Sequence, residues 1–250
     1  MNSATKQTYK LLIFDLDGTL IDSVPDLTTA LGLLLQSLSL PPITETVVRQ
    51  IIGEGQRSLV ERALRRGGHP DAQGETVPLL LVDDSVKRFR GHYSANLCVK
   101  TRLYDGVTTT LRELGNTATL AVATNKPGRW ARALCETLGI APLFRFVLGE
   151  DDVGARKPDP KMLLDLCERM GVQPKDVLFV GDSRIDWRAA EAAGCDFALC
   201  TYGYGDEATF AQGQALATDG QSPFRLGTAQ RPFLCRQFPD LLTVAGLPNA

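Results

Sequence analysis

Five short apolar runs alternate along the chain with stretches that have helical periodicity. The runs cover residues 10–15, 119–124, 144–148, 176–180 and 196–199. In the first of them the four central positions are all apolar, which is typical of a central parallel strand that is buried on both faces. Between the later runs lie helical patterns at 127–138, 159–170 and 186–193, each followed by a glycine that can cap the helix. This alternation predicts an α/β fold with a parallel sheet and helices on its faces.

Residues 20–100 interrupt the alternation, because they contain helical periodicity and no convincing strand. Leu27, Leu31, Leu34 and Leu38 fall at helical spacing on one face, and the intervening polar residues predict an amphipathic helix and not a membrane span. We therefore expect a catalytic core made of residues 1–21 and 100–250, with residues 22–99 as an inserted helical cap. Two units joined by two linkers make a hinge, and ligands commonly bind in the cleft between such units.

The C-terminal part of the sequence offers weaker signals. Residues 212–230 are rich in Gly, Gln and Thr and predict a loop. An edge strand is expected after it, at residues 232–235.

Composition narrows the classes of function. The 250 residues carry 27 Lys and Arg against 29 Asp and Glu, and this formal charge of −2 leaves no basic surface typical of proteins that bind nucleic acid or anionic membranes. A hydrophobic content of 44% argues against disorder. The N-terminal residues contain no apolar segment of a secretory signal, so we expect a cytoplasmic protein. No feature of the sequence indicates an oligomeric state.

No two of the six cysteines form a CxxC pair, so we do not expect them to bind zinc. We expect them to be buried, reduced thiols. His69 and His92 are isolated in the sequence, and we expect them to be structural or solvated.

Two acidic residues follow the first strand. Asp15 and Asp17 stand at the carboxyl end of that strand, where open parallel sheets gather functional groups, and Gly18 permits the chain to turn there. Two carboxylates that lie close together repel each other unless a cation lies between them, and hard oxygen ligands of this kind suit Mg²⁺. A solvated turn is the alternative, because Asp and Gly are common turn residues.

A second acidic pair follows the run at 176–180. Asp182 and Asp186 are four residues apart and are expected on one helix face, where capping of the helix N-terminus is the alternative role. If this strand lies beside the first, four acids meet in one crevice.

Polar and basic residues follow two other predicted elements. Thr124 and Asn125 precede a helix, where a hydroxyl and backbone N–H groups can bind an anion, although a plain N-cap looks the same. Lys157 precedes the next helix and could place a positive charge beside a phosphate, although a surface lysine is the alternative in isolation. The combination of acids and this lysine indicates a site for metal and phosphate.

The ordered motifs DLDGT, TN, KP and GDSxxD resemble those of the haloacid dehalogenase superfamily of aspartyl-nucleophile phosphatases. The resemblance covers residues 10–205, and the segments IGEGQRSLVERAL and ATNKP are similar to bacterial phosphatases of 2-phosphoglycolate. It implies a Rossmann-like core, with strand order 5-4-1-2-3, and an all-helical cap inserted after the first motif.

The resemblance also implies roles for individual residues. Asp15 would be the nucleophile, and Asp17 the general acid and base. Thr124, the amide of Asn125 and Lys157 would hold the phosphoryl oxygens. Mg²⁺ would bind the Asp15 carboxylate, the Asp17 carbonyl oxygen and Asp182, while Asp186 would orient these ligands without touching the metal.

The loop formed by Gly53, Glu54 and Gly55 in the cap would contribute to substrate preference. At Glu54 the family usually has an uncharged polar residue, so the sequence departs from the pattern at this point.

The implied function is a Mg²⁺-dependent phosphomonoesterase that acts on a small phosphorylated metabolite, with 2-phosphoglycolate as the expected substrate. Alternatives are a phosphatase for another small metabolite such as a sugar phosphate, a sugar-phosphate mutase, a dehalogenase, or a binding protein without catalysis. A dehalogenase needs neither the acid at Asp17 nor a metal ligand at Asp182, and retention of every catalytic residue argues against a binding protein. We expect the protein to bind neither nucleic acid nor membranes.

Overall fold

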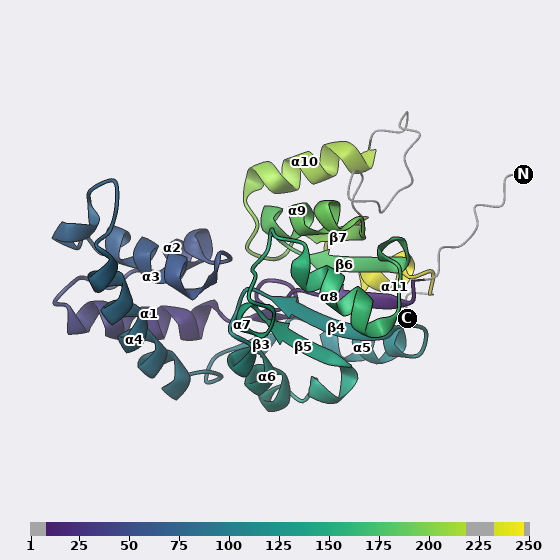
Figure 1. Cartoon of the computed structure of the whole chain (residues 1–250), viewed down its shortest axis with the longest axis horizontal. Helices are drawn as coiled ribbons and strands as arrows, with labels where there is room; N and C mark the ends of the chain where they lie inside the picture. The colour runs from purple at the N-terminus through teal and green to yellow at the C-terminus, as the bar shows by residue number, and fades with distance from the viewer. Residues whose placement is uncertain (1–8, 219–232, 248–250) are drawn as a thin grey trace, which may run out of the picture.

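The computed structural model describes residues 9–218 and 233–247, and its centre is a six-stranded parallel sheet (Figure 1). The strands stand in the order β5-β4-β1-β6-β7-β8. Their bounds are β1 Leu11–Phe14, β4 Thr119–Thr124, β5 Phe146–Gly149, β6 Val177–Gly181, β7 Asp196–Cys200 and β8 Phe233–Cys235. The five strands expected from the sequence follow the order 5-4-1-2-3, and β8 is a sixth strand outside β7.

Helices cover both faces of the sheet because β1 is apolar on both of its faces. Leu12 and Phe14 pack with residues of α5, α6 and α11, whereas Leu11 and Ile13 pack with residues of α8 and α9 on the other face. The helices on the core are α5 Val107–Gly115, α6 Gly128–Thr137, α7 Glu150–Val153, α8 Lys161–Met170, α9 Arg184–Ala193, α10 Glu207–Thr218 and α11 Asp240–Val244. Short 3₁₀ turns cover Ala141–Leu143 and Pro174–Asp176.

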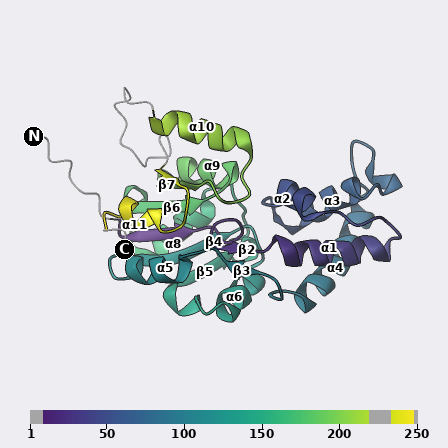
Figure 2. The ribbon, with the colours of Figure 1, turned by 180° about the vertical axis from the view of Figure 1, so that it is seen from behind.

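Four helices between Asp22 and Arg102 form a helical insertion beside the sheet (Figure 1, Figure 2). They are α1 Val24–Ser37, α2 Glu45–Ile51, α3 Gly55–Arg66 and α4 Leu79–Ala95, with a 3₁₀ turn at Pro70–Ala72. The insertion has an apolar cluster of its own, in which Leu27, Leu31 and Leu34 of α1 are buried and Leu38, directly after the helix, is partly buried. Trp130 of α6 is buried in this cluster, and Tyr204 of the core packs against it.

The chain enters and leaves the helical insertion side by side. Strands β2 Ile21–Asp22 and β3 Arg102–Leu103 pair as an antiparallel two-stranded sheet. Beside them, buried Asp26 of α1 accepts hydrogen bonds from the backbone N–H groups of residues 99–101, at 2.8–2.9 Å, and from the Thr101 hydroxyl at 2.8 Å. Both crossings are therefore fixed to each other. The division of the chain at residues 22 and 99 stays a prediction.

Three expectations from the sequence were wrong in detail. Strands β2 and β3 were not predicted, and α10 extends to Thr218 across the first part of the expected loop at 212–230. The rest of that loop lies outside the described residues, as does Pro232 of the expected edge strand. Asp182 precedes α9 and is not part of the helix, so it does not share a helix face with Asp186.

The cysteines are free thiols, five of them buried and Cys98 partly so, as expected. Within residues 9–218 and 233–247, none of the helices has the length and apolar character needed to traverse a lipid bilayer.

Candidate active site

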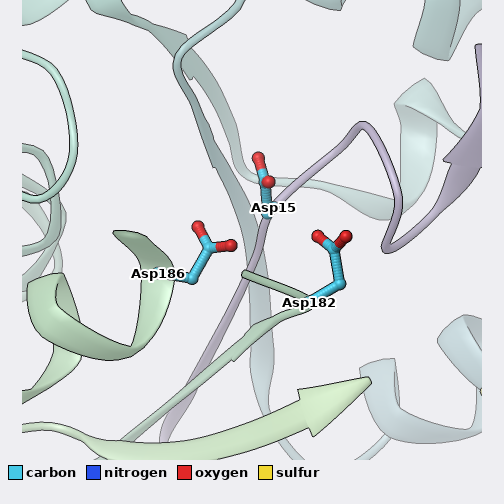
Figure 3. A group of neighbouring side chains, drawn as sticks. All are labelled: Asp15, Asp182 and Asp186. Atoms are coloured by element: carbon cyan, nitrogen blue, oxygen red, sulfur yellow. The ribbon is translucent and has the colours of Figure 1, made fainter. Parts of the chain in front are cut away.

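Three carboxylates converge at the carboxyl edge of the sheet (Figure 3). Asp15 directly follows β1, Asp182 directly follows β6, and Asp186 lies in the first turn of α9. Because β1 and β6 are hydrogen-bonded neighbours, the three residues come together although they are far apart in the sequence. Each offers a carboxylate oxygen, and these oxygens all lie within 4.8 Å of one another.

Glycines let the surrounding loops approach these acids. Gly18 has φ +84°, and a Cβ at this position would lie 2.3 Å from Oδ2 of Asp182. At Gly203 a Cβ would lie 2.3 Å from the Gly18 carbonyl oxygen and 2.4 Å from Cβ of Asp182. Both distances are far below van der Waals contact, so the site requires glycine at both positions.

Lys157 pairs with two of the three acids of the cluster, Asp15 and Asp186. Its Nζ is 2.8 Å from Oδ1 of Asp15 and 2.6 Å from Oδ1 of Asp186, and its side chain is 2% exposed. Burial alone would lower the pKa of Lys157, but the two carboxylates outweigh this effect and raise it. The lysine is therefore a fixed positive charge.

The single lysine does not neutralise the cluster. Burial raises the pKa of Asp15 to about 7, against the opposing effect of Lys157, and the charge of Asp186 adds to the rise. Burial and the neighbouring carboxylates also raise the pKa of Asp182 well above its usual range. Oδ1 of Asp15 is buried and receives no well-aligned hydrogen bond from a described residue, although the Lys157 ammonium is near. These properties fit a site for a hard divalent cation.

The oxygens of Asp186 already have protein partners. One accepts from Lys157 at 2.6 Å, and the other accepts from the backbone N–H of Ser183 at 3.1 Å and from its hydroxyl at 2.5 Å. Ser183 in turn caps the N-terminus of α9. This arrangement is consistent with a residue that orients the site and does not itself bind the metal.

Asp17 lies apart from the three-carboxylate cluster. Its carboxylate accepts a hydrogen bond from the Ser23 hydroxyl and pairs with Nζ of Lys126 at 2.9 Å. Lys126 was not predicted as a functional residue, although it is buried and its ammonium lies 5.0 Å from the centre of the Tyr93 ring. The sequence carries no signal of this, because a lysine directly before a helix, as here between Asn125 and Pro127, usually lies in solvent.

Thr124 and Asn125 lie at the carboxyl end of β4 and are buried. The Asn125 side chain accepts from the backbone N–H of Lys157 at 2.7 Å and donates to its carbonyl oxygen at 3.0 Å. It also donates to the carbonyl oxygen of Gly53 at 3.1 Å. One amide group thus joins two core loops to the helical insertion.

A cavity of about 80 Å³ opens beside these groups. The described residues that line it include Asp15, Asp17, Thr124, Asn125, Lys126 and Asp182 from the core, and Leu27, Gly53, Gly55, Leu59, Phe89 and Tyr93 from the helical insertion. Glu54 is not among them, because its carboxylate pairs with Arg62 at 2.5 Å. The hydrogen bond from Arg62 lowers the pKa of Glu54, so its charge is balanced outside the cavity.

Comparison with known proteins agrees with this geometry. A family model described as haloacid dehalogenase-like hydrolase matches residues 9–194. Phosphoglycolate phosphatase 1 of Pseudomonas aeruginosa is 42% identical over 196 residues, covering 78% of this chain and 70% of the relative. Phosphoglycolate phosphatase of Yersinia pseudotuberculosis is 37% identical over 238 residues, covering 94% and 93%.

A crystal structure of a predicted phosphoglycolate phosphatase from Haemophilus somnus superimposes with a TM-score of 0.81 at 34% identity, covering 94% of this chain and 97% of the other. With matching motifs, fold and relatives, the chain belongs to the haloacid dehalogenase-like hydrolase family.

Proposed function

We propose that this protein is a Mg²⁺-dependent phosphomonoesterase that hydrolyses 2-phosphoglycolate to glycolate and phosphate. The observation that carries the proposal is the convergence of Asp15, Asp182 and Asp186 around Lys157, with Asp17 beside them at the same sheet edge. The relatives named phosphoglycolate phosphatase, which match most of the chain, support the choice of substrate.

Asp15 is the proposed nucleophile. A carboxylate oxygen attacks phosphorus, an aspartyl-phosphate bond forms, and the bond from phosphorus to the ester oxygen breaks. Thr124 and the backbone amide of Asn125 hold phosphoryl oxygens, and Lys157 supplies positive charge as negative charge develops on them. The hydrogen bonds of Asn125 to the loop of Lys157 keep these groups in register.

Asp17 is the proposed general acid and base. In its acid form it donates a proton to the leaving ester oxygen, and glycolate departs. It then takes a proton from water, whose oxygen attacks phosphorus and displaces Asp15. The Ser23 hydroxyl and Lys126 hold the Asp17 carboxylate in place for both steps.

The carboxylate of Asp15, the carbonyl oxygen of Asp17 and Asp182 would hold Mg²⁺. When bound, the ion neutralises negative charge on the phosphoryl group as a Lewis acid. Asp186 orients these ligands through Ser183 and Lys157.

Phosphate release from 2-phosphoglycolate, measured with Mg²⁺ and with EDTA, tests the proposal. We expect turnover with Mg²⁺, none in EDTA, and inhibition by Ca²⁺, whose larger and looser coordination shell misplaces the phosphate. A panel of sugar phosphates and other phosphorylated metabolites, with product analysis, separates hydrolysis from isomerisation. Full turnover in EDTA contradicts the metal assignment, and a sugar phosphate preferred over 2-phosphoglycolate contradicts the substrate.

A further inference from the structure

The wall of the cavity has an uneven distribution of charge. On the side of the helical insertion it is largely apolar, with Leu27, Leu59 and Phe89 at its surface, and Trp130 of the core helix α6 also lines it. On the core side it contains Asp15, Asp17 and Asp182. Among the described residues that line the cavity, Lys126 is the single basic side chain.

Lys126 is held in one position by its surroundings. Its Nζ is 3.0 Å from Oδ1 and 2.9 Å from Oδ2 of Asp17, and it lies over the ring of Tyr93 at 5.0 Å. Tyr93 is itself packed between Phe89, at 5.5 Å between ring centres, and Trp130, at 5.0 Å. The aromatic cluster therefore fixes the ammonium from one side, and Asp17 fixes it from the other.

We propose that Lys126 binds the carboxylate of the substrate and makes the enzyme select phosphate esters whose leaving group carries a negative charge. The inference rests on the proposed function, because it takes Asp17 to be the group that faces the leaving ester oxygen. In 2-phosphoglycolate a single methylene group separates that oxygen from the carboxylate. A leaving group beside Asp17 thus brings its carboxylate next to the ammonium that pairs with Asp17.

The ammonium can serve both partners. A lysine side chain offers three N–H donors, so contacts with both oxygens of Asp17 leave a third, which faces the Tyr93 side chain and can be shared with the substrate. The apolar wall strengthens the attraction, because charges interact more strongly where water is excluded. Without Lys126, the substrate carboxylate would face Asp17 and apolar side chains, a position that disfavours an anion.

The test compares kcat/KM for 2-phosphoglycolate and for 2-hydroxyethyl phosphate, in which a neutral hydroxymethyl group replaces the carboxylate. We expect Lys126→Met to lower the ratio of the two values by about 10- to 100-fold, the range for loss of a charged hydrogen bond. Lys126→Arg should retain most of the preference because it keeps the charge. Lys161→Met, an exposed position on α8, is the matched control and should leave the ratio unchanged.

An equal loss for both esters in Lys126→Met would overturn the inference, since Lys126 would then act only through Asp17. Circular dichroism shows whether the variant folds, and Lys126→Gln replaces it if it does not, with the same expected change in the ratio.

Binding to a background without the nucleophile separates this inference from the proposed function. Calorimetry of Asp15→Asn with Mg²⁺ should show tighter binding of 2-phosphoglycolate than of 2-hydroxyethyl phosphate, and adding Lys126→Met should remove the difference. Equal binding of the two esters to the Asp15→Asn protein, with Lys126 intact, would overturn the inference. A wild-type enzyme that hydrolyses neither ester, while the binding difference persists, would overturn the proposed function alone.

Discussion

The two aspartates that follow β1 have the same side chain and different surroundings. Asp15 lies in the acidic cluster beside Lys157, whereas Asp17 is held by Ser23 and Lys126 outside it. Such a difference between neighbouring carboxylates is how one site obtains a nucleophile and a proton carrier from the same residue type.

Substitution of each aspartate by asparagine should separate the two roles. Asp15→Asn removes the proposed nucleophile, so no phosphoenzyme should form. Asp17→Asn should slow turnover by roughly 10²- to 10⁴-fold, the usual contribution of general acid–base catalysis. With p-nitrophenyl phosphate, whose leaving group needs little protonation, Asp17→Asn should accumulate a hydroxylamine-sensitive phosphoenzyme. Phosphoenzyme trapped on Asp15→Asn would mean that the roles are misassigned.

Substitution of Gly18 by alanine adds a single methyl group and should cost much of the activity. Its new Cβ would displace Asp182, which lies 2.3 Å away, and a displacement of this kind costs on the order of 10²-fold in rate. Gly32 is the matched control, because it lies within α1 and a Cβ there meets nothing within 4 Å. Gly32→Ala should keep full activity and gain about 0.5–1 kcal/mol of stability. Equal activity of the two variants would contradict the close approach of Gly18 to Asp182.

At the scale of elements, the strands of the core were predictable from the sequence, whereas the two shortest strands and part of one helix were not. The strands of the core were predictable because a strand buried on both faces is a continuous apolar run, as in residues 11–14. Strands β2 and β3 have two residues each, too few for any periodicity. The second half of α10, from Gln212 to Thr218, was taken for a loop because the stretch 212–230 is rich in Gly, Gln and Thr, yet Gly213 permits close contact with Leu199 of β7.

The candidate site shows the same division. Residues in motifs at strand ends were predictable, because topology alone brings strand ends to one edge. The role of Lys126 was not, since it depends on packing against Tyr93 of α4, more than thirty residues earlier in the chain. The pairing of Glu54 with Arg62 was not predictable either, because it depends on how α3 places Arg62 beside the start of the helix.

Substitution of Asp26, which joins the two segments that link the helical insertion to the core, should lower the stability of the protein. Asp26→Asn replaces a carboxylate that accepts from three backbone N–H groups and a hydroxyl by an amide that also carries donors. We expect a loss of about 2–4 kcal/mol in the free energy of unfolding, measured with urea. Asp84→Asn removes an exposed pair with Arg88 and should cost less than about 0.5 kcal/mol. A similar small cost for both would mean that Asp26 does not join the crossings.

At the scale of the whole molecule, the acidic cluster should link metal binding to stability. Burial and the neighbouring carboxylates raise the pKa of Asp182, so the charged cluster is unfavourable in the metal-free protein, and a bound cation relieves this repulsion. Mg²⁺ should therefore raise Tm, by an amount that corresponds to about 2.7 kcal/mol at a hundred times its Kd.

The variant Asp182→Asn provides the control for this thermal shift. It should abolish the rise in Tm with Mg²⁺ without lowering the Tm of the metal-free protein, because the loss of one of three neighbouring negative charges offsets a weakened hydrogen bond. A rise with Mg²⁺ of the same size in both proteins would place the metal elsewhere.

The order of strands in the sheet also governs how the chain can acquire its structure during synthesis. The first strand to be made, β1, is flanked by β4 and β6, so that Leu11 pairs with Thr119 and Val177. The helices between β2 and β3 pack against one another and can form while β1 still lacks both of its own partners. The apolar strand β1 therefore has no partner strand until about half of the polypeptide, up to the end of β4 at Thr124, has been translated. During this interval the nascent chain is most exposed to aggregation, and the ribosome's pace after residue 100 determines how long the interval lasts.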